Sequence, residues 1–368
     1  MNLLTERLDL TNESDALVRV IDAIVVPPES SKKARESRSG VLDADGKFVA
    51  QSISWTSPER PVNAAPELPN WPIESLDGSY LFGGILYGHF GHFIVESLSR
   101  LWAQDAVDVP INGIIFTPKI AGFPRQAVEK LQYTARYLGL RLPIIVAEEA
   151  TRVKELFVPR QGFGMGKLIS GSRAFRTFMN ANAGTSVEAD GDECLYISRS
   201  ALPPMRGSIL GEEKLEEYLI DEGYHIFHPQ QASIEEQIAR YKAARVVISV
   251  DCSPVHLLAY VCQPKLRAAI LSRRSMEISE YLVEQLSVFK GANALAINAL
   301  VNDWMPQPGN RPSRTSFGEV DFGLLHARLL GAGFINNPTP WVSLTEAERA
   351  SELARLEASH DTSFLPFR

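Results

Sequence analysis

Residues 88–102, GHFGHFIVESLSRLW, carry a histidine, a glutamate and an arginine at intervals of four residues. On a helix that turns by about 100° per residue, His92, Glu96 and Arg100 fall within one arc, and apolar residues fill the opposite side. Such a histidine can act as a general base, with the glutamate orienting it or strengthening it as a base. A helix with an ordinary solvated polar face has the same pattern, so spacing alone leaves both interpretations open.

A second candidate is the segment SRSALPPMRGSILGEE (198–213), which follows a predicted strand. Arg199 and Arg206 would lie at the carboxyl end of that strand, and a helix would begin near Gly211. Two guanidiniums beside a helix N-terminus favour an anion such as a diphosphate or a carboxylate. The alternative is that both arginines pair with Glu212, Glu213 or other surface acids.

A third candidate is VDCSPVH (250–256), between a predicted strand and a predicted helix. Ser253 is expected as the helix N-cap with proline next to it, which would leave backbone N–H groups free for a ligand. Asp251 and His256 flank this turn, and Cys252 with His256 could act as a thiol nucleophile and its base. The alternative is that His256 is a hydrogen-bonded core residue of an apolar helix.

Two further motifs are weaker. DGD (190–192) has the spacing of an Asp-x-Asp metal site, but it precedes a strand, and a solvated acidic turn is the better interpretation. GFGMGKLISG (162–171) has the composition of a phosphate loop without its spacing, and predicts a flexible interdomain loop. No CxxC pair suggests zinc. We expect no metal site.

A regular scaffold must position these candidates, and the sequence predicts one. Short apolar segments alternate with amphipathic ones, which indicates an α/β fold with parallel sheets covered on both faces. In the first half the expected strands are 17–26, 80–87, 113–116, 143–146 and 154–159, and the expected helices are 92–104 and 124–139. In the second half the expected strands are 194–198, 224–228, 245–250, 266–271 and 294–298, and the expected helices are 211–223, 233–244, 254–262 and 276–289.

The polar, acidic stretch 182–193 is the expected domain boundary. We expect an N-terminal α/β domain at 1–185, irregular over its first 80 residues, and a doubly wound domain at 186–318. The tail, 319–368, is expected to follow a loop at 302–316 and to form helices at 319–332 and 344–358. These helices could pack on the first domain or serve a dimer.

Composition narrows the function classes. At 368 residues the chain exceeds the usual size of one hydrophobic core. Its net charge of −7 disfavours nucleic acid and anionic membrane surfaces as partners. Three cysteines form no disulfide framework and suggest a reducing compartment. We see neither a signal peptide nor a transmembrane segment, and we expect a cytoplasmic protein.

The ordered motifs together resemble a known family. GHFIVESLSRLW (91–102) resembles the H-F-x-x-E-x-x-x-R segment of glycosyltransferase family 61, which includes enzymes of capsular polysaccharide biosynthesis. LYISR (195–199) is similar to that family's strand ending in arginine, and RGSILGEEKL (206–215) to its R-x-x-x-N-E element. The segment 223–249 is similar to its strand, proline turn, helix and following strand. The similarity covers roughly residues 80–272.

This resemblance implies a GT-B architecture, in which two Rossmann-like domains face a cleft and the C-terminal one binds the nucleotide-sugar donor. It implies an inverting, metal-independent transfer to a polysaccharide or glycolipid acceptor, without a cofactor, in the cytoplasm or at the periphery of the inner membrane. The implied catalytic residues are His92 and Glu96. The binding residues that we expect are Arg100, Arg199, Arg206, Glu212 and Gln237, together with Asp251, Cys252, Ser253 and His256 in the third segment.

Three positions depart from the family's pattern. Asp251 and Cys252 stand where the family has a histidine and a glycine, and Gly211 replaces an asparagine. A carboxylate that faces a diphosphate is unfavourable unless an arginine or a proton compensates its charge. The altered segment motivates an alternative function, an inactive GT-B-like binding or assembly protein of polysaccharide biosynthesis. A hydrolase that uses Cys252 and His256 is a third possibility.

Overall fold

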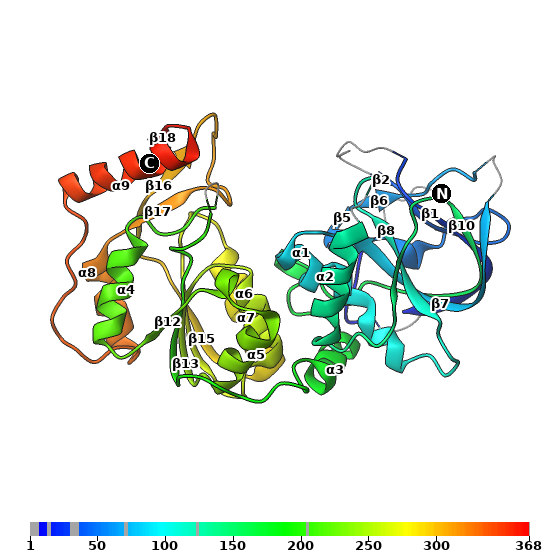
Figure 1. The fold of residues 1–368 in the computed structure, drawn as a ribbon, viewed down its shortest axis with the longest axis horizontal. Helices are drawn as coiled ribbons and strands as arrows, with labels where there is room; N and C mark the ends of the chain where they lie inside the picture. Colours follow the sequence, from blue (N-terminus) through cyan, green and yellow to red (C-terminus); the bar gives the residue numbers. More distant parts are fainter. Residues whose placement is uncertain are drawn as a thin grey trace. The chain divides into compact units, whose positions relative to one another are not determined.

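The computed structural model describes residues 7–12, 16–29, 37–69, 73–122, 125–203 and 206–367. The chain divides into two compact units, Met1–Ser186 and Val187–Arg368 (Figure 1). Among the described residues, no helix is both long and apolar enough to cross a bilayer.

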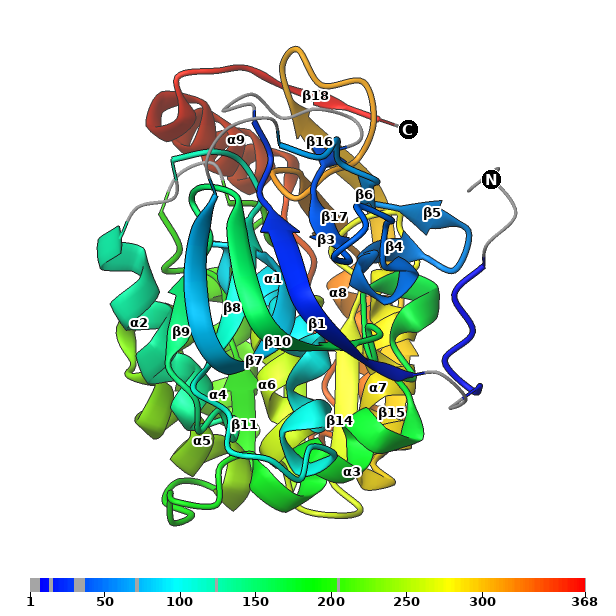
Figure 2. The same ribbon diagram turned by 90° about the vertical axis from the view of Figure 1, so that its right-hand side faces the viewer.

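The first unit is built on a six-stranded sheet with the order β3-β1-β10-β7-β8-β9. Its strands are β1 (Leu17–Val26), β3 (Gly40–Leu42), β7 (Glu74–Leu86), β8 (Gly113–Pro118), β9 (Ile144–Val146) and β10 (Thr151–Pro159). β7 to β10 are parallel to one another, whereas β1 runs antiparallel to both β10 and β3. Figure 2 shows β1, β10 and β7 as long, curved neighbours.

The predicted parallel pairing is confirmed for the strands from β7 to β10, and β1 and β3 extend the sheet with antiparallel pairing. The strand at 17–26 forms as predicted, but it precedes the repeating strand–helix pattern, so the pattern carries no information about its direction. β10 follows β9 in the chain, yet it lies between β1 and β7 and not at the edge beside β9.

The helices of the first unit are α1 (Phe90–Val95), the 3₁₀ helix η3 (Ser97–Asp105), α2 (Arg125–Arg136), the 3₁₀ turn η4 (Gly166–Leu168) and α3 (Arg173–Asn182). The predicted single helix at 92–104 is thus wrong in part. Ser97 Oγ donates to the carbonyl of Ile85, and the Ser99 carbonyl accepts the N–H of Gly162, so both residues bond outside a regular helix.

The segment before α3 is also not the flexible interdomain loop that its glycines suggested. Phe163 and Leu168 are buried in the first unit. Ser172 caps α3 by accepting the N–H of Phe175, and this cap followed by apolar residues was a usable helix signal.

The described part of the irregular N-terminal region contains short strands and a 3₁₀ turn: β2 (Ser37–Arg38), η2 (Ala50–Ser52), β4 (Trp55–Ser57), β5 (Arg60–Pro61) and β6 (Asn63–Ala64). Parts of the expected surface loops, residues 30–36 and 70–72, lie outside the described residues.

The second unit contains a fully parallel sheet with the order β12-β11-β13-β14-β15. Its strands are β11 (Cys194–Ile197), β12 (His225–Phe227), β13 (Val246–Val250), β14 (Arg267–Leu271) and β15 (Asn293–Ile297). This is a doubly wound order in which the winding direction reverses between β11 and β13. Ligands of such sheets bind outside the carboxyl ends of the strands at this reversal, the switch point.

Helices cover both faces of this sheet. They are α4 (Glu212–Asp221), α5 (Ile234–Ala243), α6 (Pro254–Val261), α7 (Ile278–Lys290) and α8 (Phe322–Gly331), and a 3₁₀ turn, η5 (Pro229–Gln231), follows β12. In Figure 1, α4 and α8 lie on one side and α5 to α7 on the other. Ser233 caps α5 through the N–H of Glu236, as predicted.

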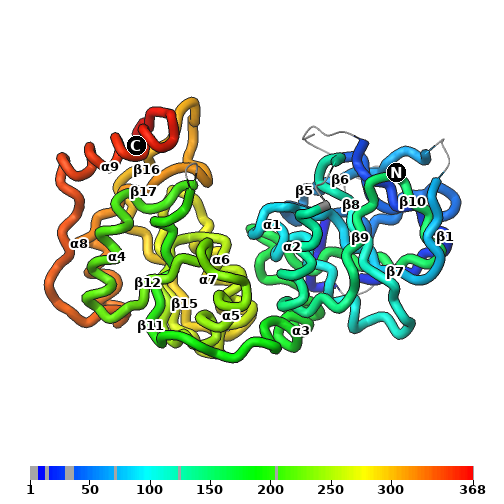
Figure 3. The backbone as a smooth tube through the Cα atoms, in the orientation of Figure 1, coloured from blue at the N-terminus to red at the C-terminus, as the bar shows by residue number. Residues whose placement is uncertain are grey.

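The tail is part of the second unit. It forms β16 (Leu300–Pro306), β17 (Phe317–Val320), α9 (Glu346–His360) and β18 (Phe364–Pro366), with β16 central in a three-stranded sheet. The loop predicted at 302–316 and the helix predicted from 319 are therefore partly wrong. Figure 3 traces the tail through α8, near α4, and on to α9, near β17. Phe322 and Leu325 of α8 share a hydrophobic core with Leu215 of α4, which places the tail in this unit's core.

Candidate functional site

In the first unit, His92 and Glu96 meet as the spacing predicted. Glu96 donates its backbone N–H to the carbonyl of His92 at 2.7 Å, and Glu96 Oε2 is in close contact with His92 Nδ1. The Glu96 side chain is 7% exposed and that of His92 is 49% exposed. The Glu96 carboxylate accepts a hydrogen bond from Nδ1, so Nδ1 carries the proton of the neutral ring. Nε2 is then the nitrogen that can accept a proton.

Aromatic neighbours hold the His92 ring. Tyr87 stacks on it with centroids 5.4 Å apart, and His89 meets it edge-on at 5.7 Å. Burial, and secondly the charge of Glu96, raise the pKa of Tyr87, so its hydroxyl stays protonated. This unit thus presents one oriented, half-exposed imidazole.

Arg100, expected to bind substrate, is fully buried. Its guanidinium donates to the carbonyls of Pro159 (2.8 Å) and Ile53 (2.7 Å). Burial lowers its pKa to about 9. Gly84 makes room for it, because a Cβ there would lie 2.3 Å from Arg100 Nη1. Arg100 therefore ties the segment before β4 to the end of β10 and presents no surface to a ligand.

In the second unit, Glu212 holds together the loop after β11. It is 1% exposed and accepts hydrogen bonds from Tyr196 Oη at 2.8 Å, from Arg199 N at 2.9 Å and from Ser208 Oγ. Burial raises the pKa of this carboxyl group, and the hydrogen bonds oppose that shift. Glu212 thus places its own carboxylate in the first turn of α4, where the helix dipole favours negative charge. These hydrogen bonds give Glu212 a positioning role in this loop.

The guanidiniums of Arg199 and Arg206 are not paired with the acids that the alternative interpretation named. Arg199 donates twice to the Gly207 carbonyl, through Nε at 2.9 Å and Nη2 at 2.8 Å. Burial, and secondly repulsion by Arg273, lower its pKa to about 10. Arg206 is half-buried, and its side chain makes no hydrogen bond or ion pair to any described residue.

Asp251 has two arginine partners that its sequence neighbourhood did not predict. Its Oδ1 lies 3.2 Å from Arg273 Nε and 3.3 Å from Arg274 Nη2. Asp251 is fully buried, and the Arg273 side chain is 4% exposed. Both arginines follow β14 directly in the sequence SRRS (272–275), so their place after a predicted strand was an available signal.

Arg199, Arg273 and Arg274 therefore gather at the carboxyl ends of β11 and β14, beside the switch point. Arg273 Nη1 and Arg274 Nε are buried and have no hydrogen-bond partner among the described residues. Burial and, after it, repulsion by Arg273 lower the pKa of Arg274. An added anion would relieve this repulsion between guanidiniums, and a diphosphate has the charge and the acceptor oxygens to do so.

Ser253 takes the N-cap position of α6, but its side chain accepts no capping hydrogen bond. The backbone N–H groups of Val255 and His256 donate to the carbonyls of Cys252 (3.2 Å) and Ser253 (3.1 Å). The expected free N–H groups are therefore already bonded at these two positions.

Cys252 and His256 do not form a nucleophile and base. His256 is 7% exposed, and its Nδ1 contacts Gln285 Oε1 at 2.6 Å, so it is a hydrogen-bonded core histidine. Cys252 is 6% exposed, and burial raises the pKa of its thiol. Gln237 is also 8% exposed, and its amide donates to the carbonyl of Pro229 at 2.9 Å. It supports the turn after β12.

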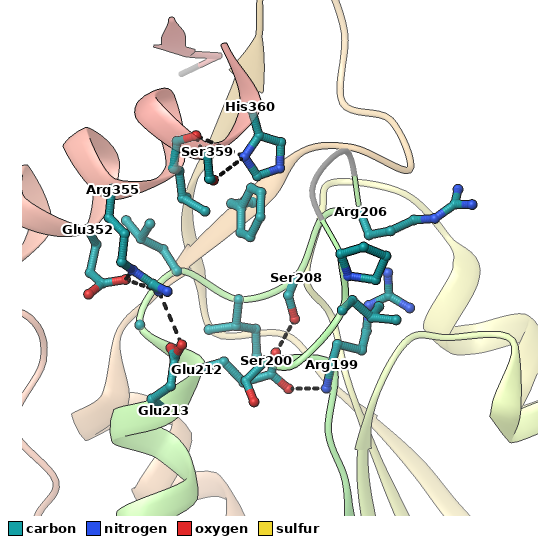
Figure 4. Close-up of a pocket in the computed structure, with 17 residues that line it drawn as sticks. Arg199, Ser200, Arg206, Ser208, Glu212, Glu213, Glu352, Arg355, Ser359 and His360 are labelled. Carbon is teal, nitrogen blue, oxygen red and sulfur yellow. Dashed lines mark hydrogen bonds and ion pairs between the residues drawn. The ribbon is translucent and has the colours of Figure 1, made fainter. Parts of the chain in front are cut away.

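A cavity of about 190 Å³ lies next to Arg199 and Arg206 in the second unit (Figure 4). One wall comes from the loop after β11 and the start of α4, and the other from the tail. We call this cavity the tail pocket. Its tail residues are Phe317, Glu352, Arg355, Leu356, Ser359 and His360.

Within the described part of the chain, no group of three or more His, Cys, Asp or Glu residues is arranged to hold a metal ion. No curated protein matches the sequence significantly. Residues 90–269, from α1 to β14, match the family model described as Glycosyltransferase 61. This match identifies the protein as a glycosyltransferase enzyme.

Proposed function

We propose that the protein transfers a sugar, with inversion, from a nucleotide-sugar donor to a hydroxyl of a surface or capsular polysaccharide or glycolipid acceptor. The observation that carries the proposal is the group of three arginines at the carboxyl ends of β11 and β14. Departure of a nucleoside diphosphate develops negative charge, and fixed guanidiniums stabilise that charge without a metal ion.

His92 is the general base of the proposed reaction. The acceptor oxygen forms a bond to the anomeric carbon, the bond from that carbon to the diphosphate oxygen breaks, and His92 Nε2 takes the hydroxyl proton. Glu96 orients the ring through Nδ1. A single displacement of this kind inverts the anomeric carbon. The proposal includes a GT-B arrangement, in which the first unit supplies the base and the second unit binds the donor.

The charge of Asp251 does not argue against a diphosphate. In the altered segment, Asp251 stands where the family has a histidine. Arg273 and Arg274 compensate the negative charge of this carboxylate. This compensation supports transfer over the alternative, an inactive binding or assembly protein.

Protection against heating by nucleotides tests the donor site. Arg206→Ala should reduce the rise in melting temperature that a bound nucleotide sugar or nucleoside diphosphate causes, because this guanidinium is available for a phosphate beside the three arginines that remain. Arg245→Ala, which removes an exposed arginine paired with Glu193, is the matched control and should leave protection unchanged. Unchanged protection in Arg206→Ala would contradict the assigned role.

A further inference from the structure

We propose that the tail pocket binds the nucleobase of the donor and that His360 and Phe317 select the base. This inference rests on the proposed function, because it assumes a nucleotide donor. The family match ends at residue 269, whereas α9 and β17 lie beyond it. The tail would therefore give this chain a donor specificity that the matched region does not encode.

The pocket has the polarity that a nucleotide requires. Arg199 and Arg206 lie at one side of it (Figure 4). Apolar side chains line the adjoining surface: Leu202, Ile209, Leu210, Phe317 and Leu356. Apolar and aromatic surfaces suit the flat face of a base, and guanidiniums suit phosphate oxygens. This places the phosphates toward the loop after β11 and the base toward the tail.

The third arginine of the pocket does not compete for the phosphates. Arg355 Nη2 pairs with Glu213 at 3.1 Å and with Glu352 at 2.6 Å. Its charge is already compensated, so the anionic end of the ligand belongs with Arg199 and Arg206.

His360 supplies a hydrogen-bond acceptor. Its Nδ1 lies 2.8 Å from the Leu356 carbonyl, which can only accept, so Nδ1 carries the proton and Nε2 is the acceptor of the neutral ring. Nε2 is buried and has no partner among the described residues. Phe317 meets the ring edge-on at 5.7 Å and fixes its orientation. An N–H or amino group on the edge of a base would satisfy Nε2.

Calorimetric binding of UDP, CDP, ADP, GDP and inorganic pyrophosphate tests the inference. The wild-type protein should prefer one nucleoside diphosphate over the other three and over pyrophosphate. His360→Phe keeps an aromatic ring but removes the acceptor, so it should lose about tenfold in affinity for the preferred nucleotide, with pyrophosphate binding unchanged. His225→Phe, at a partly exposed histidine of β12 outside the pocket, is the matched control and should retain the preference.

Photo-cross-linking of the wild-type protein by azido-base nucleotides gives a second measurement that does not depend on a variant folding. The label should lie on β17 or α9. Label elsewhere, or an unchanged preference in His360→Phe, would overturn the base site and leave the proposed function standing. If the wild-type protein bound no nucleoside diphosphate or nucleotide sugar at all, both proposals would fall.

Discussion

The different burial of His92 and Glu96 gives the two side chains different roles. The carboxylate is buried and bound to Nδ1, while half of the imidazole surface is open. A buried acceptor on Nδ1 fixes the tautomer and stabilises the imidazolium that forms when Nε2 takes a proton. The pair is thus a base and its orienting group.

Glu96→Gln should lower the turnover number by roughly 10²- to 10⁴-fold with little change in KM, because it preserves shape but removes the charge that stabilises the protonated ring. Steady-state release of nucleoside diphosphate measures both constants. His225→Gln, at an exposed histidine of β12, is the control and should leave turnover nearly unchanged. Equal turnover in Glu96→Gln and the wild-type protein would exclude this role.

The three cysteines should be unreactive in the folded protein. Burial raises the pKa of Cys252 and Cys194, and that of Cys262 to about 12, so each is a thiol at pH 7.5 and not the reactive thiolate. Mass spectrometry after iodoacetamide should find modification of Cys252 only once the protein is unfolded. Rapid modification of native Cys252 with loss of transfer would restore the thiol mechanism.

At the scale of elements, β7 is shaped by the residue that packs against it. Gly84 has a φ of +87°, and Arg100 occupies the space where its side chain would be. The strand's pairing with β8 shifts register between Phe82 and Gly84. The irregular backbone at Gly84 therefore makes the space that the buried guanidinium of Arg100 occupies.

Gly84→Ala should destabilise the protein by about 3 kcal/mol, from backbone strain and from the collision with a guanidinium held by four hydrogen bonds. Gly122→Ala is the matched control, because Gly122 also has a positive φ, of +80°, but a Cβ there meets nothing within 4 Å. Denaturant melts give both free energies of unfolding. Equal losses would show that Arg100 imposes no constraint.

Ion pairs of Asp251 with Arg273 and Arg274 connect the carboxyl ends of β13 and β14. Asp251→Asn should destabilise the protein by about 3 kcal/mol, because it leaves two largely buried arginines without their carboxylate. Added pyrophosphate should restore part of the melting temperature by replacing that negative charge. An unchanged melting temperature, or no effect of pyrophosphate beyond that on the wild-type protein, would contradict the anion site.

At the scale of the molecule, the second unit was the more predictable. Four of its five parallel strands, β11 to β14, are each followed by a helix before the next strand, and apolar periodicity reports that alternation directly. In the first unit, the direction of β1 and the place of β10 depend on pairing between distant segments. The 3₁₀ geometry of η3 depends on bonds from Ser97 and Ser99 to other elements. A local sequence pattern therefore predicts neither the pairing of these strands nor the 3₁₀ geometry.

The candidate site was predictable in position more than in partners. The arginines at strand ends follow from the rule for open sheets, and His92–Glu96 follows from spacing. Three features depend on packing between distant segments. They are the pairing of Asp251 with Arg273 and Arg274, the hydrogen bond between His256 and Gln285, and the pocket that the tail lines near Arg199. Burial makes Arg100, which was expected to bind substrate, a structural residue, and the hydrogen bonds of Glu212 hold the loop after β11.

The most direct test of a nucleotide-sugar transferase is release of nucleoside diphosphate from a panel of nucleotide sugars, measured for the wild-type protein and His92→Ala. The wild-type protein should consume one donor, by slow hydrolysis if no acceptor is present. His92→Ala should consume that donor at least about a hundredfold more slowly while nucleotide still protects it against heating. If the wild-type protein neither bound nor consumed any member of the panel, the account of this site as a nucleotide-sugar transferase would be contradicted.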